Sequence, residues 1–347
     1  MADHSPPRIA LCRGAERVSN LHRALEPVID RVDWPTRQAV LVKPNLVMPT
    51  PPHAITHPDA LATVLDVVRQ RYDGPLTIAE GCAGNPTPDV FEAQGYARLA
   101  AFYRARLLDL NADETLPVTV CDRGGRPLRL RLARTVVASD CRISLSLPKT
   151  HDTVLVTLSI KNMIMGALVN RRVAGSGGRP AWLDRLGKMA RGHGNGWGSD
   201  KTAMHQGYPT INLNLALLAP LVRPHLSVLD GFIAMEGAGP VNGEPVPWGI
   251  AVAGTDSLAV DILTARLMGF GLNEVGYLHY CATLGLGCAD LARVEVVGNI
   301  AQEAVARAFK PHPRHEEQRR WQRAGALEFL RRTLPTAPTP APEVSAS

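Results

Sequence analysis

Three lysines of this chain lie in apolar stretches of the sequence, where a surface lysine is not expected. The sequence has six lysines against 32 arginines, so arginine is its usual cation. Lys43, Lys149 and Lys161 nevertheless lie among apolar residues. A lysine amine can hold an anion as a point charge, and when burial lowers its pKa it can act as a base or form a Schiff base. We therefore predict that Lys149 and Lys161 are catalytic and that Lys43 binds substrate.

His151 is the third predicted catalytic residue. It lies two positions after Lys149, and imidazole is the side chain most easily set to titrate near neutral pH. Residues 156–162, which follow, fit two periodicities. A strand would place Lys161 on a face with serine and threonine, whereas a helix would place it on an apolar face. In both cases Lys161 differs from a typical surface lysine.

Polar side chains follow nearly every predicted strand. In open α/β sheets the ligand crevice lies outside the carboxyl ends of the strands, so these side chains are candidates for binding. Some are also typical helix caps, Asp256 among them. Asp256 and Asp261 are separated by about 140° around a helix, which argues against a paired-carboxylate site. The predicted substrate-binding residues are Lys43, Asn45, Glu80, Asn162, His205, Asp230 and Asp256.

The apolar pattern predicts an α/β fold. Short apolar runs alternate with stretches of helical period, as in a mostly parallel sheet with helices on both faces. The predicted strands are residues 8–12, 39–43, 76–79, 107–110, 142–147, 226–229, 250–253 and 294–297. The predicted helices are residues 18–32, 58–72, 88–105, 210–221, 257–268 and 274–284.

Two segments interrupt this alternation. Residues 173–208 are rich in glycine, and we expect this insertion to form a mobile lid. Near the C-terminus, residues 316–334 predict a basic helix, and residues 335–347 form a Pro/Ala/Thr/Ser tail that we expect to be disordered. The predicted organisation is one domain over residues 1–310 that carries the insertion, followed by the helix (311–334) and the tail.

Composition excludes several classes of function. The net charge is only +6 and aromatic residues make up 5% of the chain, which argues against nucleic-acid binding. No apolar segment has the length of a signal peptide or membrane span, so we expect a cytoplasmic protein without a membrane partner. The six cysteines form no C-x-x-C pair, which predicts no iron–sulfur cluster. Phosphate loops, nucleophile elbows and H-E-x-x-H motifs are absent from the sequence.

Several short segments of the sequence form a pattern when they are taken together. They are Val42-Lys43-Pro44-Asn45, Thr56-His57-Pro58, Glu80-Gly81, Asp140 with Leu147-Pro148-Lys149-Thr150-His151, Lys161-Asn162 with Gly166, His205, Asp230-Gly231, Gly239-Pro240 with Gly243, and Asp256 with Ala259-Val260-Asp261. In this combination the sequence resembles the domain of unknown function 362 family (DUF362). The resemblance spans about residues 8–300 and is nearly full length. Many members carry a ferredoxin-like segment with cysteine-rich motifs, which this sequence lacks, and the family is largely uncharacterised.

The leading hypothesis is an enzyme that acts on a small anionic metabolite by Lys/His acid–base chemistry, as in an isomerase or lyase. A second hypothesis is a redox or metal-dependent enzyme partnered with a separate electron carrier. Its candidate ligands are Glu80, His151, His205, Asp230 and Asp256, although their spacing is not that of a metal motif. A third is a non-catalytic adaptor that docks through the basic C-terminal helix. Substrate, cofactor and homo-oligomer formation stay open at this level.

Overall fold

A 10-stranded sheet forms the centre of the molecule in the computed structural model, which describes residues 5–34, 38–170 and 199–334. Neighbours along its main path are parallel except that β11 is antiparallel to β1 and β10. The predicted α/β fold with a mostly parallel sheet is confirmed. In spatial order the path is β12 (Glu295–Gly298), β1 (Arg8–Arg13), β11 (Glu244–Gly254), β10 (Leu226–Glu236), β7 (Cys141–Ser146), β2 (Val40–Lys43), β3 (Leu76–Glu80) and β4 (Ala105–Asp109).

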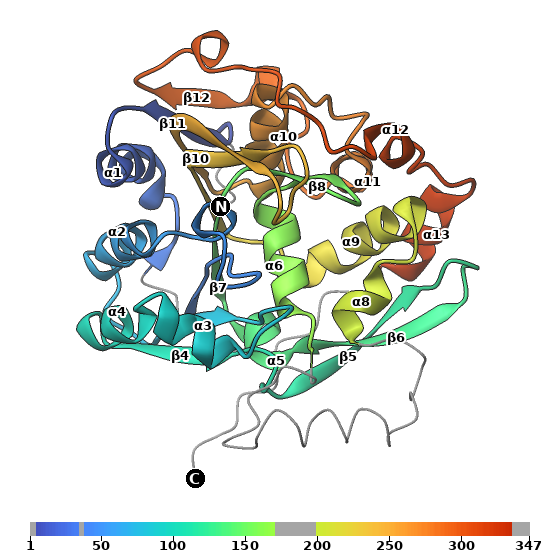
Figure 1. Cartoon of the computed structure of the whole chain (residues 1–347), viewed down its shortest axis with the longest axis horizontal. Coiled ribbons are helices and arrows are strands. Elements are labelled where there is room, and N and C mark those ends of the chain that lie inside the picture. The colour runs from blue at the N-terminus through green and yellow to red at the C-terminus, as the bar shows by residue number, and fades with distance from the viewer. Residues whose placement is uncertain (1–4, 35–37, 171–198, 335–347) are drawn as a thin grey trace.

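Helices cover both faces of the sheet because each central strand is apolar on both sides. In β1, Ile9 and Leu11 join one buried cluster while Ala10 and Cys12 join the other. One face carries α1 (Arg17–Ile29), α2 (Pro58–Arg69), α3 (Thr87–Ala93) and α4 (Tyr96–Phe102). The opposite face carries α6 (Ser159–Ala167), α9 (Tyr208–Val222), α10 (Ser257–Leu267) and α11 (Gly276–Thr283), and the separation of the two groups is visible in Figure 1.

All eight predicted strands are present, with shifted ends. The predicted helix 88–105 is wrong as one element, because Gly95 takes a left-handed φ of 70° and divides it into α3 and α4. Two strand pairs were not predicted from the sequence. They are the half-exposed hairpin of β5 (Thr115–Cys121) and β6 (Pro127–Ala133), and the three-residue strands β8 (Lys149–His151) and β9 (Leu155–Thr157). The ambiguous segment 156–162 is both strand and helix, since β9 ends at Thr157 and α6 begins at Ser159.

The predicted single C-terminal helix is wrong. It consists of α12 (His315–Gln318) and α13 (Ala326–Thr333), and Gly325 precedes α13 with a left-handed φ of 71°. Trp321 between them is buried, with its ring 5.2 Å from that of Tyr280, and Leu330 is buried as well. The segment therefore belongs to the core. Truncation before Glu316, which would test a docking role, would also remove these buried side chains.

The glycine-rich insertion can be described only in part. Residues 171–198, which hold most of the predicted lid, and the tail 335–347 lie outside the described residues. The end of the insertion contains α8 (Asp200–Met204), whose N-cap residue Ser199 accepts a hydrogen bond from Thr202 N through its hydroxyl oxygen. Arg131 on β6 pairs with Asp200 at 2.9 Å and holds this helix against the hairpin.

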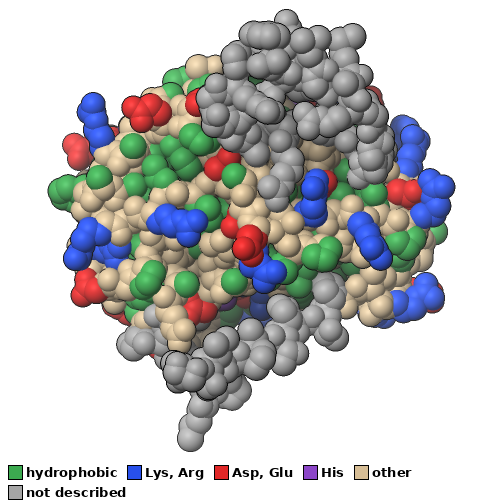
Figure 2. Space-filling model, turned by 90° about the horizontal axis from the view of Figure 1, so that it is seen from below, with side chains coloured by type: hydrophobic (Ala, Val, Ile, Leu, Met, Phe, Trp, Pro, Cys, Tyr) green, Lys and Arg blue, Asp and Glu red, His purple; other side chains and the backbone are tan. Residues whose placement is uncertain are grey.

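Charged side chains of both signs are interspersed on the face shown in Figure 2. The described part of that face has no continuous basic patch of the kind that follows a nucleic-acid backbone. No helix in the described ranges combines the length and apolar character needed to cross a bilayer.

Candidate functional site

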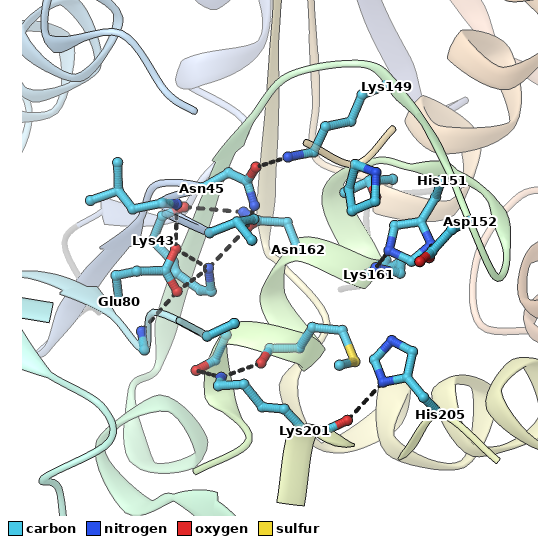
Figure 3. Close-up of a pocket in the computed structure, with 18 residues that line it drawn as sticks. Lys43, Asn45, Glu80, Lys149, His151, Asp152, Lys161, Asn162, Lys201 and His205 are labelled. Atoms are coloured by element: carbon cyan, nitrogen blue, oxygen red, sulfur yellow. Dashed lines mark hydrogen bonds and ion pairs between the residues drawn. The ribbon is translucent and has the colours of Figure 1, made fainter. Parts of the chain in front are cut away.

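A cavity of about 200 Å³ opens where the carboxyl ends of β2 and β3 meet β8, α6 and α8. Its walls contain four of the six lysines (Figure 3). Of the remaining two, Lys188 lies outside the described residues and Lys310 is exposed at the surface. Eight of the ten predicted site residues line the cavity: Lys43, Asn45, Glu80, Lys149, His151, Lys161, Asn162 and His205.

Lys43 is held by the protein on all sides. Its ammonium lies 3.0 Å from Glu80 and donates to Pro44 O and to Asn162 Oδ1, both at 2.9 Å. Glu80 also accepts hydrogen bonds from the backbone N–H groups of Leu46 and Gly81. Because an ammonium has three N–H donors, these contacts satisfy Lys43 completely. Lys43 thus forms part of the wall and has no free donor for a ligand.

Gly166 on α6 permits this close packing. A Cβ at that position would overlap Cε and Nζ of Lys43 and would meet Glu80 Oε1. Gly81 in turn faces the backbone carbonyl of Gly166, so the end of β3 and the helix approach each other through two glycines. Glu80-Gly81 and Gly166 are far apart in the sequence, but they meet in one close contact at the cavity wall.

Lys149 is fully buried at a different part of the cavity. Its Nζ donates to Asn45 Oδ1 at 2.6 Å and to Ala54 O at 2.8 Å. Both acceptors are neutral, and no carboxylate among the described residues pairs with this ammonium. Burial, together with the charge of Lys161, lowers the pKa of Lys149 to about 7. The group is therefore poised between its charged and neutral forms at physiological pH.

Lys161, His151 and Asp152 form a hydrogen-bonded chain. Lys161 Nζ lies 2.9 Å from His151 Nε2, and His151 Nδ1 lies 2.9 Å from Asp152 Oδ1. Burial lowers the pKa of Lys161 to about 8, and burial with the Lys161 charge lowers the pKa of His151 well below its usual value. At neutral pH the ammonium therefore donates to a neutral imidazole. The backbone N–H of Thr153 donates to His151 Nδ1 at 3.0 Å, so this nitrogen is contacted by both Thr153 and Asp152.

Lys201 and His205 close the cavity from α8. Lys201 was not predicted as a site residue. The scarcity of lysine in the sequence could have indicated it. Its ammonium donates to Met165 O and Gly166 O at the end of α6. Burial lowers its pKa to about 8. His205 Nδ1 donates to Lys201 O, which leaves Nε2 as an acceptor, and its ring stacks 6.4 Å from that of His151.

Two buried side chains position the catalytic candidates without lining the cavity. Asp261 on α10 accepts hydrogen bonds at 2.9 Å from Ser159 N and Ile160 N, so it caps the helix that carries Lys161. Burial raises the pKa of Asp261 to about 7. Gln318 on α12 donates to His151 O at 2.6 Å. Neither role follows from sequence spacing, because both partners are distant in the chain.

Asp230 and Asp256 lie outside the cavity, which corrects their predicted place in the binding site. Asp230 forms an ion pair at 2.9 Å with Arg17 on α1. Asp256 caps α10 by accepting from Ala259 N and also accepts from Cys288 N. Asp230 lies within β10 and Asp256 follows β11, as the sequence pattern predicted. Each carboxylate, however, binds the neighbouring groups named above and does not line the cavity. Pro240, which belongs to the segment Gly239-Pro240 of the family resemblance, lines the cavity.

The candidate metal ligands do not come together. Glu80, His151 and His205 line the cavity, whereas Asp230 and Asp256 are elsewhere. Across the described parts of the chain, no three His, Cys, Asp or Glu side chains are arranged to hold a metal ion. Most cysteines are buried, and none of the described six forms a disulfide. The absence of an iron–sulfur cluster stays a prediction.

Two known proteins are similar to this chain over part of their length. A thylakoid-associated protein of Synechocystis sp. is 27% identical over 238 residues, which cover 66% of this chain and 62% of that protein. This chain therefore matches less than two thirds of the relative's length. The lactate racemase apoprotein of Thermoanaerobacterium thermosaccharolyticum aligns with a TM-score of 0.42 and 13% identity, over 80% of this chain and 57% of that chain.

The family model described as "Domain of unknown function (DUF362)" matches residues 40–266. This range includes β2, β3, β8, α6, α8 and the turn at Pro240, so every residue that lines the cavity lies within the match. The match covers more than half of the sequence. The chain belongs to the DUF362 family.

Proposed function

We propose that this protein is an enzyme that binds a small carboxylate in the lysine-lined cavity and moves a proton next to the carboxylate or an adjacent carbonyl. The reaction class would be that of an isomerase or lyase. The observation that supports this proposal is the convergence of Lys149, Lys161 and Lys201, three buried ammonium groups without a carboxylate ion pair at 4 Å or less among the described residues.

Unused hydrogen-bond donors favour an anionic ligand. Of three N–H donors on each ammonium, Lys149 and Lys201 each use two on the protein and Lys161 uses one. Buried charges and donors left unpaired are unfavourable, so a ligand that accepts from them would be bound strongly. A carboxylate supplies both the acceptors and the opposite charge.

Lys161 and His151 suit proton transfer. The lowered pKa of Lys161, about 8, lies close to the working pH, where a group exchanges protons most effectively. In its neutral form the amine can accept a proton from substrate carbon, and His151 with Asp152 can stabilise the ammonium that results. His205 Nε2 is a second acceptor at the same cavity.

The cavity volume limits the substrate to a small metabolite. Sites for drug-sized ligands have volumes of roughly 300–1,000 Å³, and this cavity has about 200 Å³. A molecule with a few carbons and one or two carboxylates fits this space, whereas a dinucleotide does not.

The proposal predicts carboxylate binding that depends on Lys149 and Lys161. We would titrate the wild type, Lys149→Met and Lys161→Met with acetate, lactate, malate and succinate by calorimetry at pH 7. Since hydrogen bonds to charged groups contribute about 1.5–3 kcal/mol, each variant should bind roughly ten- to a hundredfold more weakly. Lys310→Met is the matched control, because Lys310 is exposed and pairs with Glu244.

The chemical step is tested with the same compounds in D₂O. The wild type should exchange a carbon-bound proton of a bound carboxylate with solvent, as measured by NMR, and His151→Gln should slow that exchange. Equal binding by wild type and Lys149→Met would contradict the anion site. Absent exchange, or exchange unchanged in His151→Gln, would contradict acid–base catalysis.

A further inference from the structure

The ammonium groups of Lys149 and Lys201, each with one donor not used by the described residues, are located at two separate ends of the cavity. Lys149 Nζ lies beside Asn45 and Ala54, next to the loop that follows β2. Lys201 Nζ lies beside Met165 and Gly166, at the C-terminal end of α6. Figure 3 shows these two lysines at opposite sides of the group, with Lys161 and His151 along the side between them.

Helix α6 gives the scale of this separation. Lys161 lies in its first turn, and Met165, whose carbonyl binds Lys201, lies four residues later. Four residues of α-helix rise about 6 Å. The Lys201 ammonium is therefore anchored roughly one helical turn beyond Lys161, while Lys149 lies on the other side of the acid–base pair.

Charge balance distinguishes the two ends from the rest of the wall. Lys43 is neutralised by Glu80, and the Lys161–His151 pair is adjacent to Asp152. Lys149 and Lys201 instead bind only neutral oxygens of the described residues. Each of these two buried ammonium groups therefore lacks an ion-pair partner at 4 Å or less, and Glu80, which pairs with Lys43, acts on both only at longer range. A ligand with a single carboxylate would leave one of them uncompensated.

We infer that the cavity is built for a dicarboxylate, with one carboxylate on Lys149, the other on Lys201, and the intervening carbon facing Lys161 and His151. This inference rests on the proposed function and specifies its substrate class. The donor that remains on each terminal lysine would bind one carboxylate oxygen. Lys161 retains two donors at the middle, where a hydroxyl or carbonyl oxygen of the substrate would lie.

The test compares succinate with butyrate, which has the same number of carbons and one carboxylate. Calorimetry at pH 7 should show that the wild type binds succinate about ten- to a hundredfold more tightly than butyrate. Lys201→Met should remove this preference, so that succinate binds the variant about as weakly as butyrate binds the wild type. Lys310→Met should keep the full preference.

Lys201→Met also removes a contact to the end of α6, so its melting curve must be checked. If that variant does not fold, Lys149→Met provides the same comparison from the other end. Equal binding of succinate and butyrate to the wild type, with both weakened by Lys161→Met, would overturn the inference and leave the proposed function intact. Binding of neither compound would overturn both. A preference for succinate that survives both terminal substitutions would overturn the inference alone.

Discussion

Replacing Lys43 with methionine should lower the free energy of unfolding by about 3–5 kcal/mol. The substitution keeps most of the aliphatic stem but removes the charge that neutralises Glu80, whose side chain is 3% exposed. Glu80 would then be a buried carboxylate with only the backbone N–H groups of Leu46 and Gly81 as partners. Urea unfolding of Lys43→Met against the wild type measures the loss.

A double variant separates the stranded charge from a simple packing defect. Lys43→Met combined with Glu80→Gln removes both charges, and it should be more stable than Lys43→Met alone. Lys310→Met serves as the surface control and should unfold like the wild type. If Lys43→Met keeps wild-type stability, the ion pair is not the structural element that we describe, and Lys43 returns to the set of ligand-binding candidates.

Replacing Lys149 with methionine should change how stability depends on pH. The pKa of Lys149 is about 7 in the folded protein, lowered by burial and by Lys161, and about 10.4 in an unfolded chain. Between these values the unfolded state binds one proton more than the folded state. The wild-type free energy of unfolding therefore gains up to about 1.4 kcal/mol per pH unit from this residue as pH rises.

The difference between wild type and Lys149→Met isolates this contribution. Below pH 7 the lysine is protonated in both states, so the difference should be constant. From about pH 7.5 to 9.5 the wild type should gain stability relative to the variant. Urea unfolding at pH 6, 7, 8 and 9 provides the comparison. Parallel profiles across that range would show that the Lys149 pKa is not lowered, and Lys310→Met should give such a parallel profile below pH 9.

The fold was predictable from the sequence because its signals are local. Alternating apolar runs mark the strands, and the carboxyl ends of parallel strands meet at one edge, so Lys43, Glu80 and Lys149 were expected to lie together. The scarcity of lysine in this sequence added Lys161 to the predicted site residues. The half-exposed β5–β6 hairpin was not predicted, because arginines and a proline interrupt its apolar pattern.

The other parts of the site depend on contacts between distant segments. The sequence excluded a paired-carboxylate site made of Asp256 and Asp261 on one helix. In the structure Asp261 instead caps α6, a helix distant in the sequence. Asp230 follows the expected pattern of a strand residue near the crevice, but Arg17 binds it away from the cavity. Lys201 reaches the cavity from α8, which is held to β6 through Asp200.

The most direct test of the lysine site is the number of protons taken up when an anion binds. At pH 8 Lys149 is mostly neutral, and an anion that binds its ammonium must draw a proton from solution. Calorimetric titration of the tightest-binding carboxylate, in two buffers of different ionisation enthalpy, should show uptake of about one proton or more at pH 8, where Lys161 and Lys201 are also partly neutral, and little uptake at pH 6. Above pH 8 the affinity should fall by up to about tenfold per pH unit for each lysine that must take up a proton. Binding without proton uptake at pH 8, with an affinity that stays constant from pH 7 to 9, would contradict an anion held by these lysines.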